Sequence, residues 1–260
     1  PGSITNVMTL LLVMEALDSG KIKLTDKVTA SKHACSMGGT QIWLEENEQM
    51  SVEDLLKATA VVSANDASVA LGEFLAGSEE TFVQQMNARA KELGMKNTVF
   101  HNATGLDADG HVSTARDIAI MSRELLKHKD ITKYTTIWMD SLRDGKNSLV
   151  NTNKLIRFYQ GATGLKTGTT DGAGACLSAS ATRNGMDLIA VTMGSANSDE
   201  RFASARKLLD YGFGNYAVYT PQVDQTKLLP VKVLRGVDTG VAVEAPTLQG
   251  VVIPKGKEKE

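Results

Sequence analysis

The pattern of apolar and polar positions predicts that the first half of the chain is mostly helical. Residues 3–17 repeat apolar side chains at helical spacing, and Gly20 stands where such a helix would end. Ser51 and Ser78 each precede a similar run with acidic residues in its first turn, which is typical of a helix N-terminus. The pattern therefore predicts four further helices. One begins at residue 51, and the other three span residues 65–75, 78–93 and 114–127.

The second half predicts strands and turns instead. Asp144-Gly145 and Asn184-Gly185 are dipeptides favoured in two-residue hairpin turns, because both positions need a positive φ. The second dipeptide is flanked by predicted strands, and after residue 220 short Val-rich segments alternate with prolines. The predicted strands are residues 176–182, 186–193, 231–234, 241–243 and 251–253, and a helix is predicted at residues 198–209. Helices first and a hairpin later favour an α+β fold with an antiparallel sheet.

Composition narrows the class of protein without identifying it. The chain has 260 residues, 42% of them hydrophobic, and a net charge of −2. This balance fits one full-sized domain with a smaller module, and it gives no reason to expect nucleic-acid binding. No apolar run reaches the ~20 residues that span a bilayer. Cys35 and Cys176 either form a pair or are two buried thiols, and the four histidines have no ligand spacing, so we expect no metal site.

Three short polar clusters carry the candidate chemistry. They are Ser3-Ile4-Thr5-Asn6 at a helix start, Ser63-Ala64-Asn65 between two helices, and Lys166-Thr167-Gly168 before the late hairpin. Each cluster alone is typical of a helix cap, a turn or a strand end. Their order along the chain and their context make them informative together.

In that order the clusters resemble the SxxK, SxN and KTG signature of the serine D-alanyl-D-alanine carboxypeptidases, the low-molecular-mass penicillin-binding proteins. The resemblance extends over nearly the whole chain to about residue 216, through residues 8–11, 63–71, 102–107, 115–117, 164–170 and 208–213. It implies a β-lactamase/penicillin-binding-protein-like catalytic domain over residues 1–216, with an antiparallel sheet flanked by helices. Residues 217–260 resemble the start of a small C-terminal β domain. The family's leading strands and its membrane anchor are not in this sequence, so we expect a trimmed fragment.

The resemblance also assigns roles to individual residues. Ser3 matches the nucleophile, and Asn6 occupies the position of the lysine that acts as its general base. Ser63 would relay protons towards the leaving group, and Asn65 would hydrogen-bond the substrate backbone. Lys166 would supply positive charge beside the two serines.

Substrate binding falls to the strand that follows. Thr167, Gly168 and Thr169 would form an edge against which the substrate lies as an added strand. The backbone N–H groups of Ser3 and Thr169 would form the oxyanion hole. Arg201 matches a family arginine near the terminal carboxylate of the substrate, and the alternative is an exposed arginine on a capped helix.

Asn6 departs from the family pattern at the position that matters most for catalysis. An asparagine amide cannot take a proton at neutral pH, and general-base assistance contributes ~10² to 10⁴ in rate. We therefore expect this chain to be severely impaired in turnover. Rescue by Lys166 is not expected, because the loss of a neighbouring cation removes one reason for Lys166 to have a lowered pKa.

Three functions follow from the resemblance. The first is a D,D-carboxypeptidase by descent that removes the terminal D-Ala from peptidoglycan stem peptides and is acylated by β-lactams. The second is a pseudoenzyme that binds D-Ala-D-Ala peptides without cleaving them. A β-lactamase is the weakest, since no Glu-containing segment is assignable to activating the hydrolytic water. The protein would act outside the cytoplasmic membrane, and its reaction would need no cofactor. A full-length protein could associate peripherally with the membrane, but we expect no anchor in this chain.

Overall fold

The computed structural model describes residues 1–259, and the contacts divide the chain into two compact units. The first unit comprises residues 1–182 and 187–210. The second comprises residues 183–186 together with the chain from Tyr211 onward. The first unit contains all three polar clusters.

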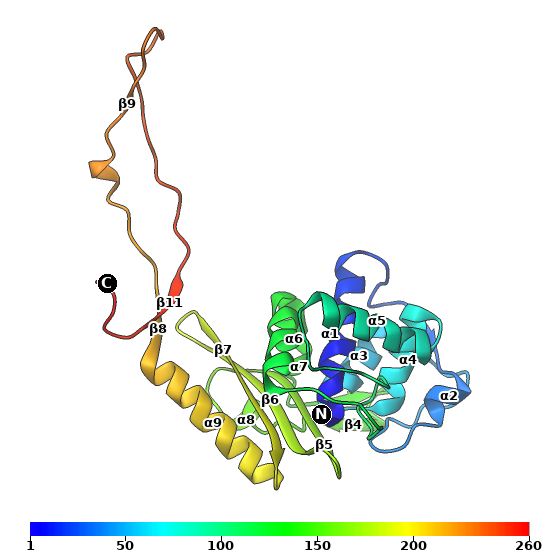
Figure 1. Ribbon diagram of the computed structural model, residues 1–260. Coiled ribbons are helices and arrows are strands. Elements are labelled where there is room, and N and C mark those ends of the chain that lie inside the picture. The colour runs from blue at the N-terminus through cyan, green and yellow to red at the C-terminus, as the bar shows by residue number, and fades with distance from the viewer. Residues whose placement is uncertain (260) are drawn as a thin grey trace. The chain divides into compact units, whose positions relative to one another are not determined.

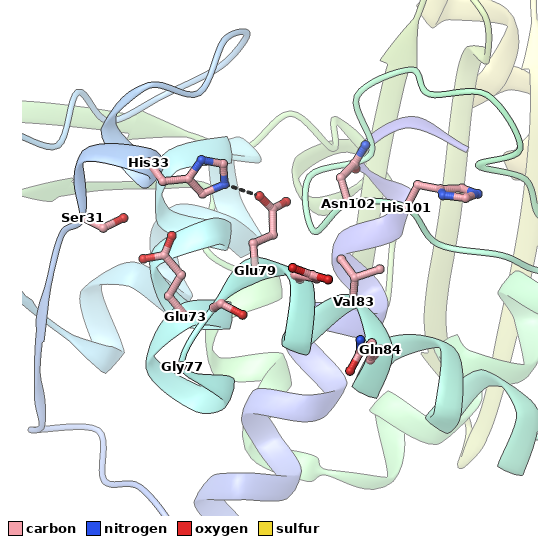
Figure 2. Close-up of a pocket in the computed structure, with 11 residues that line it drawn as sticks. Ser31, His33, Glu73, Gly77, Glu79, Val83, Gln84, His101 and Asn102 are labelled. Carbon is pink, nitrogen blue, oxygen red and sulfur yellow. Dashed lines mark hydrogen bonds and ion pairs between the residues drawn. The ribbon is translucent and has the colours of Figure 1, made fainter.

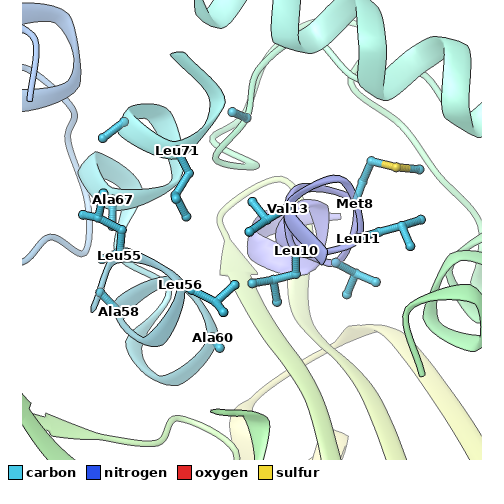
Figure 3. Close-up of a cluster of buried hydrophobic side chains, with 14 of the residues drawn as sticks. Met8, Leu10, Leu11, Val13, Leu55, Leu56, Ala58, Ala60, Ala67 and Leu71 are labelled. Atoms are coloured by element: carbon cyan, nitrogen blue, oxygen red, sulfur yellow. The ribbon is translucent and has the colours of Figure 1, made fainter. Parts of the chain in front are cut away.

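Helix α1 (Asn6–Asp18) forms the centre of the first unit and follows the short 3-10 turn η1 (Gly2–Thr5). A helix with apolar residues on most of its sides belongs in the interior, and nine of the 13 residues of α1 are buried. Figure 3 shows side chains of α1 facing those of the neighbouring helices α3 (Val52–Val62) and α4 (Asn65–Ala76). The fully buried apolar residues of α1 are Val7, Met8, Leu10, Leu11 and Val13.

The helices predicted around this centre are confirmed. Ser51 caps α3, because its hydroxyl accepts a hydrogen bond from the Asp54 N–H at 3.1 Å. Ser78 caps α5 (Glu79–Glu92) in the same way through Thr81 N–H, also at 3.1 Å. α4 and α6 (Ala115–Lys127) complete the set and agree with the predicted ranges to within one or two residues.

The central sheet has three strands in the order β5–β6–β7, with bounds Ala162–Thr170, Gly174–Arg183 and Met186–Ser195. The predicted Asn184-Gly185 turn is confirmed, with φ of 50° and 74°. Helix α9 (Ser198–Asn215) lies on the face of the sheet opposite α1 (Figure 1) and runs six residues beyond the predicted end. The α+β prediction is thereby confirmed.

Several short elements were not predicted. They are β1 (Lys27–Thr29), β2 (Gln49–Ser51), α2 (Lys32–Cys35), α7 (Thr132–Thr135) and α8 (Leu155–Phe158). The Asp144-Gly145 hairpin is present between β3 (Met139–Leu142) and β4 (Asn147–Val150), but its loop has four residues. Three of the four, Arg143, Asp144 and Gly145, have a positive φ. Cys35 and Cys176 are free thiols in the described structure, and only Cys176 is fully buried.

The second unit consists of short antiparallel pairs. β8 (Tyr216–Tyr219) pairs with β11 (Val251–Pro254), and β9 (Val231–Lys232) pairs with β10 (Gly240–Val241), while η3 (Gln225–Lys227) precedes β9. The predicted Val-rich strands are therefore present, and two of them are shorter than predicted. Within residues 1–259, no helix is both long and apolar enough to cross a bilayer.

Candidate active site

The turn that carries Ser3 lies directly against strand β5. A β-carbon at Gly168 would stand 2.7 Å from the Ser3 backbone nitrogen and 2.8 Å from that of Ile4. Such an approach excludes any side chain, so glycine is required at this point of the KTG cluster. Gly2, at φ +59°, lies close to the backbone nitrogen of Thr169. The first and third polar clusters thus meet, which places the backbone of Ser3 beside that of Thr169.

The second cluster joins the third through a side-chain contact. α3 ends at Val62, and Ser63 turns the chain with φ 62° and ψ 37°, a left-handed conformation that is uncommon for a non-glycine residue. The Lys166 ammonium, which is fully buried, donates hydrogen bonds to the Ser63 hydroxyl and, at 3.1 Å, to the Thr167 carbonyl. A strained turn that presents a hydroxyl to a buried cation is typical of a functional site.

Burial, together with the nearby positive charge of Arg201, lowers the pKa of Lys166 to about 7. In the sequence, the loss of a cation at position 6 removes one reason for Lys166 to have a lowered pKa. The structure supplies another, because desolvation by itself disfavours the charged ammonium. Lys166 therefore loses its proton far more easily than an exposed lysine.

Asn65 is fixed by the loop before it. Its backbone N–H donates to the Thr40 carbonyl and its side-chain Nδ2 to the Gly38 carbonyl, both at 2.8 Å. Its Oδ1 is buried and has no hydrogen-bond partner among the described residues. A buried acceptor without a donor is costly, so this oxygen is available to a ligand N–H.

Asn6 is completely buried on the side of α1 that faces the 102–106 loop. Its Nδ2 donates to the Ala103 carbonyl at 3.0 Å and to the Ser68 hydroxyl at 3.2 Å. Its Oδ1 is left without a partner among the described residues. The surroundings of position 6 accept hydrogen bonds and do not donate to this oxygen, so they suit a side chain with donors only, such as lysine.

The remaining predicted residues lie on β5, except Arg201, which reaches β5 from α9. The Thr167 hydroxyl is 2.6 Å from that of Thr152, which sequence reasoning did not single out. Arg201 donates to the Thr169 hydroxyl at 2.8 Å and is only 7% exposed. The alternative interpretation of Arg201 as an exposed helix residue is therefore wrong, because the guanidinium packs under the β5 edge.

Two loop residues that the sequence-based assignment passed over also shape the site. Asp107 accepts hydrogen bonds from the Thr170 hydroxyl at 2.6 Å and from Gly172 N–H at 3.0 Å. The hydrogen bond from Thr170 lowers the pKa of Asp107, and the one from Gly172 adds to this effect. Gly105, at φ +88°, packs on the carbonyl of Gly2. Both lie within residues 102–107, a segment that carries part of the family resemblance, so the resemblance could have pointed to them.

His111 bonds to Thr5 at the end of the turn that carries Ser3. Its Nδ1 accepts from the His101 N–H at 3.0 Å, so Nε2 carries the proton and donates to the Thr5 hydroxyl at 2.8 Å. Burial, together with neighbouring positive charge, lowers the pKa of His111 to about 4. The neutral ring therefore persists well into the acidic range.

His111 will make the fold less stable in acid. The unfolded chain takes up this proton near pH 6.5 and the folded chain only near pH 4, so stability falls as the pH drops through that interval. This pKa shift corresponds to a loss of about 3 kcal/mol in the free energy of unfolding. Urea unfolding of the chain and of His111→Gln between pH 7 and pH 4 measures it. The same pH dependence in both proteins would rule out this role for His111.

A pocket near the start of α5 contains none of the predicted catalytic residues. Figure 2 shows it between the segment at Ser31 and the start of α5, where His33 Nε2 and Glu79 Oε2 are 2.5 Å apart. Glu79 also accepts from Ala103 N–H at 3.0 Å. The pair thus helps to hold the 102–106 loop that packs on Asn6.

The sequence profile of the D-alanyl-D-alanine carboxypeptidase family (Peptidase_S11) matches residues 1–197, which include all three clusters. The chain belongs to this family. It is 49% identical over 261 residues to D-alanyl-D-alanine carboxypeptidase DacF of Bacillus subtilis, covering 99% of this chain and 67% of that protein. It is 38% identical to DacC of Escherichia coli, covering 100% of this chain and 66% of that protein. The chain thus spans about two thirds of these carboxypeptidases.

Solved structures of family members agree with the fold. Penicillin-binding protein 5 of Haemophilus influenzae superposes with a TM-score of 0.85 at 35% identity, covering 100% of this chain and 77% of that one. Penicillin-binding protein D2 of Listeria monocytogenes, in a cefotaxime-bound form, gives 0.74 at 33% identity, covering 82% and 87%. The predicted penicillin-binding-protein-like catalytic fold is therefore confirmed, and the family to which the chain belongs is one of serine-type enzymes.

Proposed function

We propose that this chain is a serine D,D-carboxypeptidase by descent, whose acylation step is impaired by Asn6. Its substrate would be a peptidoglycan stem peptide ending in D-Ala-D-Ala, and β-lactams would acylate Ser3 as substrate mimics. The observation that carries the proposal is the contact of buried Lys166 with Ser63 beside the Ser3 turn. The family membership supports the same chemistry.

The reaction would begin with attack of the Ser3 hydroxyl on the carbonyl of the penultimate D-Ala. The Ser3 and Thr169 N–H groups would stabilise the oxyanion, and the Lys166–Ser63 pair would deliver a proton to the departing D-Ala amine. Water would then hydrolyse the acyl-enzyme. The step that lacks a group is the first one, because Asn6 cannot take the Ser3 proton.

Substrate binding would require fewer of these groups than catalysis. Asn65 Oδ1, which is buried and unpartnered in the described structure, would accept an N–H of the stem peptide. The β5 edge from Thr167 to Thr169 would pair with the peptide backbone, and Arg201 beneath it would attract the terminal carboxylate. None of these contacts involves Asn6, so a pseudoenzyme that only holds the peptide is the second candidate.

The location follows from the substrate. Because peptidoglycan lies outside the cytoplasmic membrane, we propose that this chain acts there. The chemistry uses side chains and backbone N–H groups throughout, and the proposal names no cofactor or metal.

D-Alanine release separates the two candidates. We expect Asn6→Lys to release D-alanine from a D-Ala-D-Ala pentapeptide, while the unchanged chain binds the peptide with little release. Ser3→Ala in the Asn6→Lys background is the control and should abolish release. An Asn6→Lys variant that folds and binds the peptide but releases nothing would favour the pseudoenzyme. Release by the unchanged chain at the Asn6→Lys rate would refute the impairment.

A further inference from the structure

Trp43 is held in an exposed position by its backbone. Its side chain is 70% exposed, and its φ is +58°, in the left-handed region where a bulky residue is a genuine outlier. A tryptophan gains nothing for folding from such a place, since it buries little surface and strains its own backbone. Strain of this kind is usually kept for function.

The residues on either side of Trp43 are anchored by a buried acid. Ile42 and Leu44 are both buried, so the exposed ring stands between two inward-facing neighbours. The Asp66 carboxylate, itself fully buried, accepts from Ile42 N–H at 3.1 Å and from Leu44 N–H at 2.9 Å. These two bonds fix both N–H groups that flank position 43.

An arginine fixes the carbonyl side of the same segment. Arg143, from the β3–β4 loop, donates to the Ile42 carbonyl at 2.8 Å and to the Trp43 carbonyl at 3.4 Å. Glu48 holds the guanidinium with two contacts of 2.6 and 2.9 Å. Because Asp66 and Arg143 fix the backbone from both sides, the Cα–Cβ bond of Trp43 keeps its outward direction as long as these bonds hold.

This loop is part of the wall of the candidate active site. Asp66 directly follows Asn65, and Asn65 bonds Gly38 and Thr40 of the same loop. The exposed indole is therefore tied to the turn that carries Ser63 and Asn65. The loop that carries Trp43 therefore borders the turn at which a ligand would bind, and the part of the ligand next to the reacting peptide could reach this loop.

We propose that Trp43 stacks on a sugar ring of the glycan strand to which the stem peptide is attached. The inference rests on the proposed function and deepens it, because it assigns a contact for the part of peptidoglycan that is not peptide. An indole offers a flat apolar face to the C–H groups of a pyranose and keeps its N–H for a hydroxyl. The exposed neighbours Glu45 and Glu46 disfavour an anionic membrane surface and leave a sugar ring unaffected.

Fluorescence tests this contact directly. The chain has two tryptophans, so Trp138→Phe leaves Trp43 as the only indole. Three ligands are titrated: a disaccharide-linked stem pentapeptide, the same pentapeptide free, and an N-acetylglucosamine oligomer without peptide. We expect both sugar-containing ligands to change the Trp43 emission and the free peptide to leave it unchanged.

Affinity and stability then separate binding from folding. We expect Trp43→Ala to bind the disaccharide-linked peptide about tenfold more weakly, with unchanged affinity for the free peptide, and Trp43→Phe to retain most of the affinity. Trp43→Gly should lose the sugar contact and unfold at the same or a higher urea concentration, because glycine tolerates a positive φ. A lower urea midpoint for Trp43→Gly together with unchanged sugar affinity would mean that Trp43 serves the fold.

The remaining outcomes distinguish the two proposals. Equal affinity of Trp43→Ala and its parent for the disaccharide-linked peptide would overturn the sugar contact. An emission change with anionic lipid vesicles, or with rising protein concentration, and none with sugar would overturn it in favour of a membrane or a second copy. If Asn6→Lys reacts with benzylpenicillin while Trp43 stays silent, only the sugar contact fails. If the oligomer binds through Trp43 but Asn6→Lys neither reacts nor binds peptide, the proposed carboxypeptidase function fails alone.

Discussion

Replacing Asn6 by lysine will restore acylation of Ser3 by benzylpenicillin and raise its rate at least ~10²-fold over that of the unchanged chain. The surroundings of position 6 suit an amine. The Ala103 carbonyl and Ser68 hydroxyl already accept hydrogen bonds from Asn6 Nδ2, whereas Asn6 Oδ1 has no donor within residues 1–259. A neutral lysine amine has two N–H donors and one lone pair, so the donors would make these two bonds and the lone pair would remain to accept the Ser3 proton.

Intact mass after timed incubation with benzylpenicillin measures the effect. Asn6→Met is the matched control, because methionine approaches lysine in length and cannot take a proton. It should stay as slow as the unchanged chain. Rapid adduct formation by the unchanged chain would show that Ser3 has another base. Loss of that adduct in Lys166→Met would then identify Lys166, whose lowered pKa of about 7 makes it the nearest alternative.

Replacing Gly105 by alanine will disrupt the turn that carries Ser3 and lower the free energy of unfolding by roughly 2–4 kcal/mol. The new β-carbon would stand 1.8 Å from the Gly2 carbonyl oxygen and 2.8 Å from the Ser3 nitrogen, both backbone atoms. The loop cannot simply withdraw, because Asn102 Oδ1 accepts from Gly105 N–H at 2.7 Å and Glu79 accepts from Ala103 N–H. In the Asn6→Lys background the substitution should also abolish acylation, since it displaces Ser3.

Gly94 provides a matched control. Its φ of +77° is similarly left-handed, but a β-carbon there would meet nothing within 4 Å. Gly94→Ala should therefore lose only about 1 kcal/mol, from the backbone conformation, and retain acylation in the Asn6→Lys background. Urea unfolding and the benzylpenicillin mass assay compare the two variants. Equal losses in both would show that the contact between the 102–106 loop and Gly2 is not what makes Gly105 necessary.

The sequence by itself determined the local elements and the chemical types at the site. Helix starts at Ser51 and Ser78 and the hairpin turn at Asn184-Gly185 depend on residues adjacent in the chain, so the local pattern was sufficient to predict them. The sequence likewise shows an amide at position 6, where the resemblance to the family predicts an amine. That fact needs no structure, because the proton-accepting capacity of a side chain is a property of its residue type.

The tertiary structure alone decided the environment of those groups. The lowered pKa of Lys166 arises from complete burial, and burial depends on what other segments place around the side chain. The inward position of Arg201 beneath β5 has the same cause. Neither could be predicted from neighbouring residues, since a lysine or arginine in a polar cluster is exposed in most local contexts.

Contacts between distant segments were equally beyond the sequence pattern. Gly105 meets Gly2 across 103 positions, and Arg143 reaches the carbonyls beside Trp43 across 100. The exposed aromatic side chain was visible in the sequence only as one apolar residue in a loop. Its fixed outward position follows from Asp66 and Arg143, which bond the flanking backbone only once α4 and the β3–β4 hairpin have packed around it.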